Sequence, residues 1–166
     1  MLGVTLFSQN TPDEPLLCKL TSVNIQGQTN VNSFEFIAEH SYSQTIKNEE
    51  KTPDHASDPL IHFLIPVTSL NSGNRIMNKD FYSMLKVDAH PEIKVSIEKS
   101  KLKNMISRNS SNLSIQLTMA GKTEWVKGTY SFDKKSEQKI KLSGSTKIQL
   151  SDFDLTPPKK MLGMIQ

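Results

Sequence analysis

Histidine and cysteine are the residues of this sequence that could do nucleophilic or metal chemistry, and they are few. The chain has four histidines and one cysteine. No two histidines have the spacing of a zinc site, and one cysteine cannot close an intramolecular disulfide. The G-x-S-x-G elbow of hydrolases and the glycine patterns of P-loop and dinucleotide-binding proteins are absent. We therefore predict a protein that is not an enzyme and needs neither a metal nor a cofactor, with surface or strand-end positions for His40, His55, His62 and His90.

Length and charge favour one soluble domain. A chain of 166 residues suits a single domain and can bury a core without disulfides. Lys and Arg total 20 against 17 Asp and Glu, a net charge of +3, which fits neither a basic nucleic-acid-binding tail nor an acidic disordered chain. No apolar run approaches the roughly 18 residues of a membrane-spanning helix. We expect no nucleic-acid partner and no membrane-spanning segment.

The first fifteen residues differ from the rest of the chain. The apolar run at residues 1–9 lacks the basic start of a secretory signal, so it is either the remnant of a signal, a first strand or a disordered terminus. Residues 11–15 (TPDEP) are typical of a linker, because each proline removes a backbone donor. Cys18 follows Leu17, which is too bulky for a lipoprotein box, so we interpret it as a strand residue. We expect a signal remnant or disordered segment at 1–15 and one domain at 16–166.

Alternation of apolar and polar residues runs through most of this domain and predicts half-buried strands. In one such segment the apolar positions are Leu113, Ile115, Leu117 and Met119. The same period marks residues 23–26, 34–38, 93–97, 126–132 and 140–150, whereas residues 60–67 are apolar almost throughout. The polar segments 43–58, 104–112 and 133–138 are predicted to be loops.

One segment has helical spacing. Four apolar residues recur there at i, i+4, i+7 and i+8, which places them on one stripe of a helix. Asn74 or Asn78 could supply the N-cap, and the helix must end before Pro91. We predict a single short helix over about residues 76–86, with a stripe of Met77, Phe81, Met84 and Leu85.

A sheet with one helix has no helical layer to cover its apolar face, so it must curl or stack to hide that face. When about eight strands close into a barrel, the interior is filled by side chains or holds a small ligand. We therefore predict an all-β fold, an antiparallel eight-stranded barrel with one short helix.

Two predicted hairpins bring a pair of glycines together. If the first hairpin is centred on residues 121–122, Ile115 lies opposite Gly128. If the second is centred on Ser136, Gly128 lies opposite Gly144, and both registers keep the apolar residues on one face. The inner face would then carry a furrow without side chains. Either the glycines relieve crowding at a barrel corner, or the furrow leaves room for a ligand, and the two readings are compatible.

Four segments in order resemble the YceI-like family. Residues 61–95 (IHFLIPVTSLNSGNRIMNKDFYSMLKVDAHPEIKV) have its apolar strand ending in Pro-Val, its Ser-Leu turn, its short helix and its following strand. Residues 117–123 (LTMAGKT) are similar to its hairpin, residues 151–158 (SDFDLTPP) to its late segment, and residues 23–34 (VNIQGQTNVNSF) to its opening strand and turn. The resemblance covers about residues 20–164, and the order of the four segments carries it.

The resemblance implies a lipocalin-like barrel that holds a long apolar chain of the polyisoprenoid type, usually in the bacterial periplasm and without catalytic residues. Family members carry a further strand after the segment that corresponds to residues 161–164, so we expect the last strand to be missing here. An open sheet edge of this kind could join two copies into a homodimer or recruit another protein.

Our leading hypothesis is a periplasmic or secreted bacterial protein that binds or transports a long apolar lipid without catalysis. The alternative is an exported interaction module that has no small-molecule ligand. The methionines, which adapt to irregular neighbours, either line the mouth of a lipid tunnel or simply pack in the core. The residues predicted to line the lipid cavity are Phe36, Phe63, Met77, Phe81, Met84, Leu85, Ile115, Leu117, Val126, Gly128, Tyr130, Leu142, Gly144, Phe153, Met161 and Met164.

Overall fold

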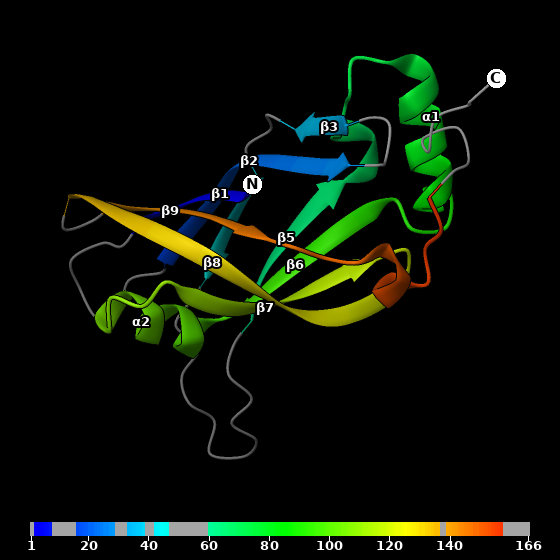
Figure 1. The fold of residues 1–166 in the computed structure, drawn as a ribbon. Helices are drawn as coiled ribbons and strands as arrows, with labels where there is room; N and C mark the ends of the chain where they lie inside the picture. The colour runs from blue at the N-terminus through cyan, green and yellow to red at the C-terminus, as the bar shows by residue number, and fades with distance from the viewer. Residues whose placement is uncertain are drawn as a thin grey trace.

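The structure, a computed structural model, describes residues 2–7, 16–28, 33–38, 42–46, 60–136 and 139–157 (Figure 1). Side-chain positions are described for residues 19–27, 33–38, 60–133 and 141–157. The elements of this part of the chain are β1 Leu2–Phe7, β2 Leu16–Gln28, β3 Ser33–Ala38, β4 Tyr42–Ile46, β5 Leu60–Pro66, α1 Arg75–Met84, β6 Glu92–Glu98, α2 Lys99–Ser107, β7 Asn112–Met119, β8 Lys122–Ser136 and β9 Lys139–Thr146, with short 3-10 turns at Val67–Ser69 and Leu150–Phe153.

The nine described strands form one antiparallel sheet in the order β3-β2-β1-β9-β8-β7-β6-β5, and β4 pairs with the first part of β2. Strand β1 lies between β2 and β9, so of the alternatives for residues 1–9 the structure has a first strand at residues 2–7. Within the described residues no ladder of hydrogen bonds joins β5 to β3 or β4. Ile37 on β3 and Asn71, which follows β5 in the chain, exchange two backbone hydrogen bonds, both with an N···O distance of 3.0 Å. The antiparallel β fold is confirmed, whereas the sheet has nine strands instead of eight and a closed barrel is not confirmed.

Burial alternates along the strands and puts the apolar residues on the inner face. In β7, Leu113, Ile115, Leu117 and Met119 are buried, and the residues between them are partly exposed. The sheet is strongly curved, with α1 and α2 at opposite ends (Figure 1). Curvature lets one apolar face bury itself, because strands of opposite parts of the sheet then share one interior.

Helix α1 confirms the predicted helix. Of the two candidate caps, Asn74 is the N-cap, and its side-chain oxygen accepts hydrogen bonds from the backbone N–H groups of Ile76 at 2.9 Å and Met77 at 3.1 Å. The helix ends at Met84, and Lys86 beyond it has a φ of 55°, the left-handed conformation common just after a helix.

The prediction of a single helix is wrong, because the described part of the chain has a second one, α2. Helix α2 also corrects the predicted loop at residues 104–112, since it includes residues up to Ser107. Leu102 and Met105 are three residues apart, and both are buried on the side of α2 that faces the core. The other predicted loops are also shorter, because β4 takes residues 42–46 and β8 extends to Ser136. Hydrogen bonds to a neighbouring strand hold these polar residues in the sheet. The sequence of such a segment does not show which strand it will pair with, so the pattern alone predicted a loop.

Both predicted hairpin registers are wrong by two residues. The first hairpin turns at Ala120 and Gly121, whose φ values are 49° and 85°, so Met119 pairs with Lys122 and Ile115 faces Val126. A two-residue turn of this kind requires positive φ at both positions and fixes the register. In the second hairpin an irregularity near residues 134–136 shifts the pairing. The inward parity is kept, because a shift of two residues returns each side chain to the same face.

The ring of Tyr130 fills the predicted furrow. In the observed register Gly144 faces Tyr130, and Gly128 faces Thr146. A Cβ on Gly144 would lie 2.0 Å from Tyr130 Cδ1, and one on Gly128 would lie 2.6 Å from Tyr130 Cε2. The two glycines are therefore not opposite each other, and the prediction of an open furrow is wrong. They leave room for a buried aromatic ring.

We expect Gly144→Ala to destabilise the fold by about 1–3 kcal/mol, because the new methyl group must displace the Tyr130 ring. In a Tyr130→Ala background the same change should have little effect on the free energy of unfolding, since the ring is gone. Urea unfolding of the two single variants and the double variant measures this coupling. Additive losses would contradict the contact, and Ser145→Ala, an exposed change on the same strand, is the control.

We expect Asn74→Ala to lower the free energy of unfolding by about 1 kcal/mol, because two N–H groups at the start of α1 lose their acceptor. Asn74→Asp keeps a capping oxygen and should remain close to the parent protein in urea unfolding. Equal losses in the two variants would show that the cap is not the source of the effect.

Candidate functional site

The inner face of the sheet and one side of α1 form a single apolar cluster, which is the candidate ligand site. Met77 and Met84 are half-buried and pack against this cluster, while Gly128 and Gly144 lie beneath the Tyr130 ring. Met161 and Met164 fall outside the described residues. The other predicted lining residues are all buried members of the cluster: Phe36, Phe63, Phe81, Leu85, Ile115, Leu117, Val126, Tyr130, Leu142 and Phe153.

Aromatic contacts fasten α1 to the sheet at one end of this interior. The rings of Phe36 on β3 and Phe81 on α1 are stacked, with centroids 4.0 Å apart and an angle of 21° between their planes. Phe34 meets Phe36 edge-on at 5.9 Å. The Tyr82 hydroxyl lies 2.8 Å from the carbonyl oxygen of Leu70 and can donate a hydrogen bond to it. These contacts fix which side of α1 faces the interior.

Apolar side chains also reach the surface at the α1 end. Ile76 on α1 is 67% exposed and Ile37 on β3 is 39% exposed. Met77 and Met84 lie between solvent and the buried cluster. We call Met77 and Met84 the apolar rim. The unbranched side chains of the rim can adapt to an apolar guest.

The α2 end of the interior contains residues that sequence reasoning missed. Leu102 and Met105 on α2 are buried members of the same cluster as Leu113 and Tyr130. The three-residue spacing of Leu102 and Met105 is compatible with a helix, but it is a weak signal because the helix has only nine residues. Inward residues of β6 also belong to the cluster, and the alternation in that strand pointed to them: Ile93, Val95 and Ile97. Ile61 and Ile65 of β5 are members too, although the sequence of that strand is apolar almost throughout and did not indicate which residues face inward.

The interior has no buried charge among the side chains that the structure describes. Tyr130 is its titratable group, and burial raises the pKa of Tyr130 to about 12. The phenol is therefore neutral at physiological pH. Such a surface suits an uncharged hydrocarbon, because an ion placed there would lose its hydration without finding an opposite charge.

A serine and a histidine meet on neighbouring strands outside this interior. His62 Nδ1 on β5 lies 2.8 Å from Ser96 Oγ on β6. Burial, and to a smaller extent the positive charge of Lys94, lowers the pKa of His62, which favours the neutral ring. The side chain of Ser96 is only 1% exposed, so a substrate cannot reach its hydroxyl. The geometry is that of a structural cross-strand pair.

The remaining candidate residues that the structure describes show no arrangement for metal chemistry. In the described part of the chain no three His, Cys, Asp or Glu residues gather in a way that could hold a metal ion. The ring of His90 packs against the turn at Gly121, where a Cβ would lie 2.7 Å from its Cε1. Cys18 lies in β2, as expected, and His40 and His55 fall outside the described residues.

Comparison with known proteins identifies the family. A family model described as the YceI-like domain matches residues 19–166. The search of curated proteins found no match. Among solved structures, the crystal structure of Burkholderia cenocepacia BcnA is similar, with 12% identity and a TM-score of 0.47 over 95% of this chain and 84% of that chain.

A search of the described helices for membrane spans found none that is sufficiently long and apolar. The family assignment rests on the extent of the match to the family model, which includes all the strands from β3 to β9. Because this match extends over most of the sequence, the chain belongs to the YceI-like family.

Proposed function

We propose that this protein is a non-catalytic carrier that binds a long apolar lipid of the polyisoprenoid type against the inner face of its curved sheet. The observation that carries the proposal is the single apolar cluster between α1 and α2, in which no described charged side chain is buried. Membership of the YceI-like family supports it, since the lipocalin-like proteins of this family are associated with apolar ligands.

The energetics favour an apolar chain over a polar ligand. Each methylene group that leaves water for an apolar interior contributes about 0.8 kcal/mol, so a long prenyl chain needs few polar contacts. Ordering the rotatable bonds of the chain offsets part of this gain. The described interior is occupied by the protein's own side chains, so a ligand must move some of them to enter.

The apolar rim is the entry that we propose. Met77 and Met84 are unbranched and half-buried, and they can change rotamer without opening the sheet. Ile37 and Ile76 add apolar surface outside them, which lowers the cost of moving a hydrocarbon from a membrane or micelle to the interior. A lipid would enter between α1 and β3 and separate the stacked rings of Phe36 and Phe81.

The proposed carrier catalyses no chemical step. Its proposed location is outside the cytoplasm. The Ser96 hydroxyl, which has a histidine beside it, is shielded from any substrate. The family resemblance supports a bacterial protein that is periplasmic or secreted. A carrier in that compartment would shield its lipid from water during transfer.

We expect the purified protein to retain an apolar lipid that organic extraction and mass spectrometry detect, and to bind an added polyprenol. Met77→Lys should weaken polyprenol binding by about tenfold, because it puts a cation in the path of the hydrocarbon. Ser83→Lys is the matched control, since Ser83 is exposed on the other side of α1 and lies outside the apolar cluster. Fluorescence titration and native mass spectrometry measure the two affinities.

Two results would contradict this function. One is a protein that carries no lipid after purification and binds neither a polyprenol nor a fatty acid of similar length. The other is an equal loss of affinity in Met77→Lys and Ser83→Lys, which would remove the rim as the entry. Circular dichroism establishes that both variants are folded.

A further inference from the structure

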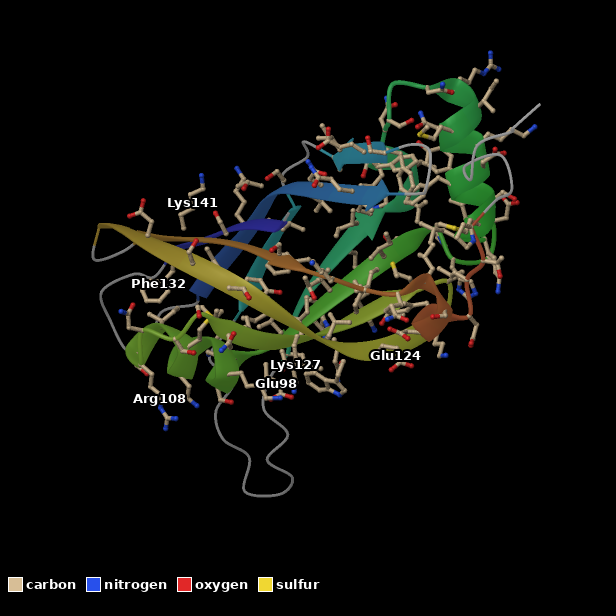
Figure 2. The ribbon with its side chains drawn as sticks, viewed as in Figure 1. Glu98, Arg108, Glu124, Lys127, Phe132 and Lys141 are labelled. Atoms are coloured by element: carbon tan, nitrogen blue, oxygen red, sulfur yellow. The ribbon has the colours of Figure 1, made fainter. Side chains whose placement is uncertain are left out.

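Helix α2 concentrates positive charge at the end of the molecule opposite α1. Lys99, Lys101, Lys103 and Arg108 lie in or directly after this helix. No acidic residue occurs in the sequence between Glu98 and Glu124, whereas the whole chain has a net charge of only +3. Figure 2 shows the Arg108 side chain directed away from the sheet. The cations of α2 therefore form a local basic surface that the net charge of the chain does not reveal.

A shallow groove between α2 and the start of β7 is lined by groups that suit phosphate oxygens. Its volume is about 260 Å³. Lys101 and Asn104 of α2 line it together with Arg108, which directly follows the helix, and with Ser110 and Asn112. No acidic residue lines it. Two cations beside amides and hydroxyls supply several donors for an oxyanion.

An exposed tryptophan lies beside Lys101, one of the residues that line this groove. Trp125 on β8 is 49% exposed, and Lys101 Nζ lies 4.2 Å from the centre of its ring. The same ammonium group is 2.9 Å from Glu98 Oε2, so Lys101 is held in place beside the indole. Lys127 is two residues from Trp125 on the same outer face of β8 and is also exposed (Figure 2). An indole among lysines is the side-chain combination that favours the headgroup level of a lipid bilayer.

We propose that α2 and Trp125 form a docking surface for a membrane that contains anionic phospholipids. The lysines and Arg108 would bind lipid phosphates, and the indole of Trp125 would enter the headgroup layer. The apolar residues Leu102 and Met105 are engaged in the core, so α2 docks on the bilayer surface and does not insert. This role goes beyond lipid binding in the interior, because it requires no ligand there.

A single exposed indole favours a membrane over a single-stranded nucleic acid as the partner. A nucleic-acid groove needs successive aromatic side chains on which bases stack. Trp125 is the only tryptophan of the sequence, and among the described side chains the other exposed large apolar residues are aliphatic. The groove outside α1, about 720 Å³, is lined by Asp88 as well as by basic residues, so it lacks the uniform positive charge of the α2 surface.

The experiment is co-sedimentation of the full chain with phosphatidylcholine vesicles that contain either no anionic lipid or roughly 30% phosphatidylglycerol. We expect binding to the anionic vesicles alone, weaker binding at high salt, and a blue shift of Trp125 emission when the indole leaves water. The double variant Lys103→Glu/Arg108→Glu should bind at least tenfold more weakly, and Lys103→Gln/Arg108→Gln should fall between it and the parent protein. Trp125→Ala should lower the affinity several-fold.

The matched control is Arg75→Glu/Lys79→Glu, which reverses the same two residue types at exposed positions of α1. It should bind anionic vesicles as the parent protein does. Equal weakening by the α1 and α2 pairs, or no emission shift on binding, would overturn the proposal. Tighter binding to a single-stranded oligonucleotide than to anionic vesicles would assign the surface to nucleic acid and would also overturn it. Polyprenol titration of each variant separates docking from interior binding, since the α2 variants should keep the affinity of the parent protein.

Discussion

An antiparallel sheet that is apolar on one face and has no helical layer above it must bury that face against itself. This constraint explains the curvature of the sheet and the position of both helices. The strands provide the wall, while α1 and α2 lie at its two ends, where curvature alone leaves the apolar interior uncovered (Figure 1). Phe81 on α1 and Met105 on α2 both join the same buried cluster as the strands.

Close packing of this interior depends on where side chains are missing. Gly128 and Gly144 leave the space that the Tyr130 ring occupies, so the ring can fill the inner face of the sheet at this place. The result is a neutral, apolar interior in which the protein's own side chains take the place of a guest. In the carrier that we propose, such an interior would make the release of a bound lipid less costly, because the side chains can close over the empty state.

The two ends of the molecule have different chemistry although both helices cover the same core. The α1 end has the apolar rim and stacked aromatic rings, whereas the α2 end has lysines, Arg108 and an exposed indole. The contrast arises because each helix uses a narrow apolar stripe for the core, and its remaining positions are free to vary. This separation is what the two proposals require, since one assigns a hydrocarbon to the α1 end and the other assigns an anionic surface to the α2 end.

Local patterning was sufficient to predict the strand faces, helix α1 and the apolar inner residues, because each depends on a period of two or 3.6 along the chain. The hairpin registers, strands β1 and β4, helix α2 and the ring over the glycines were beyond such patterns. Each depends on a partner distant in sequence: β1 pairs with β9, Met105 packs on the core, and Gly144 faces Tyr130. The periodicity of side chains can be read from one segment alone. The pairing of strands and the packing of side chains depend on other segments of the chain, so only the tertiary structure determines them.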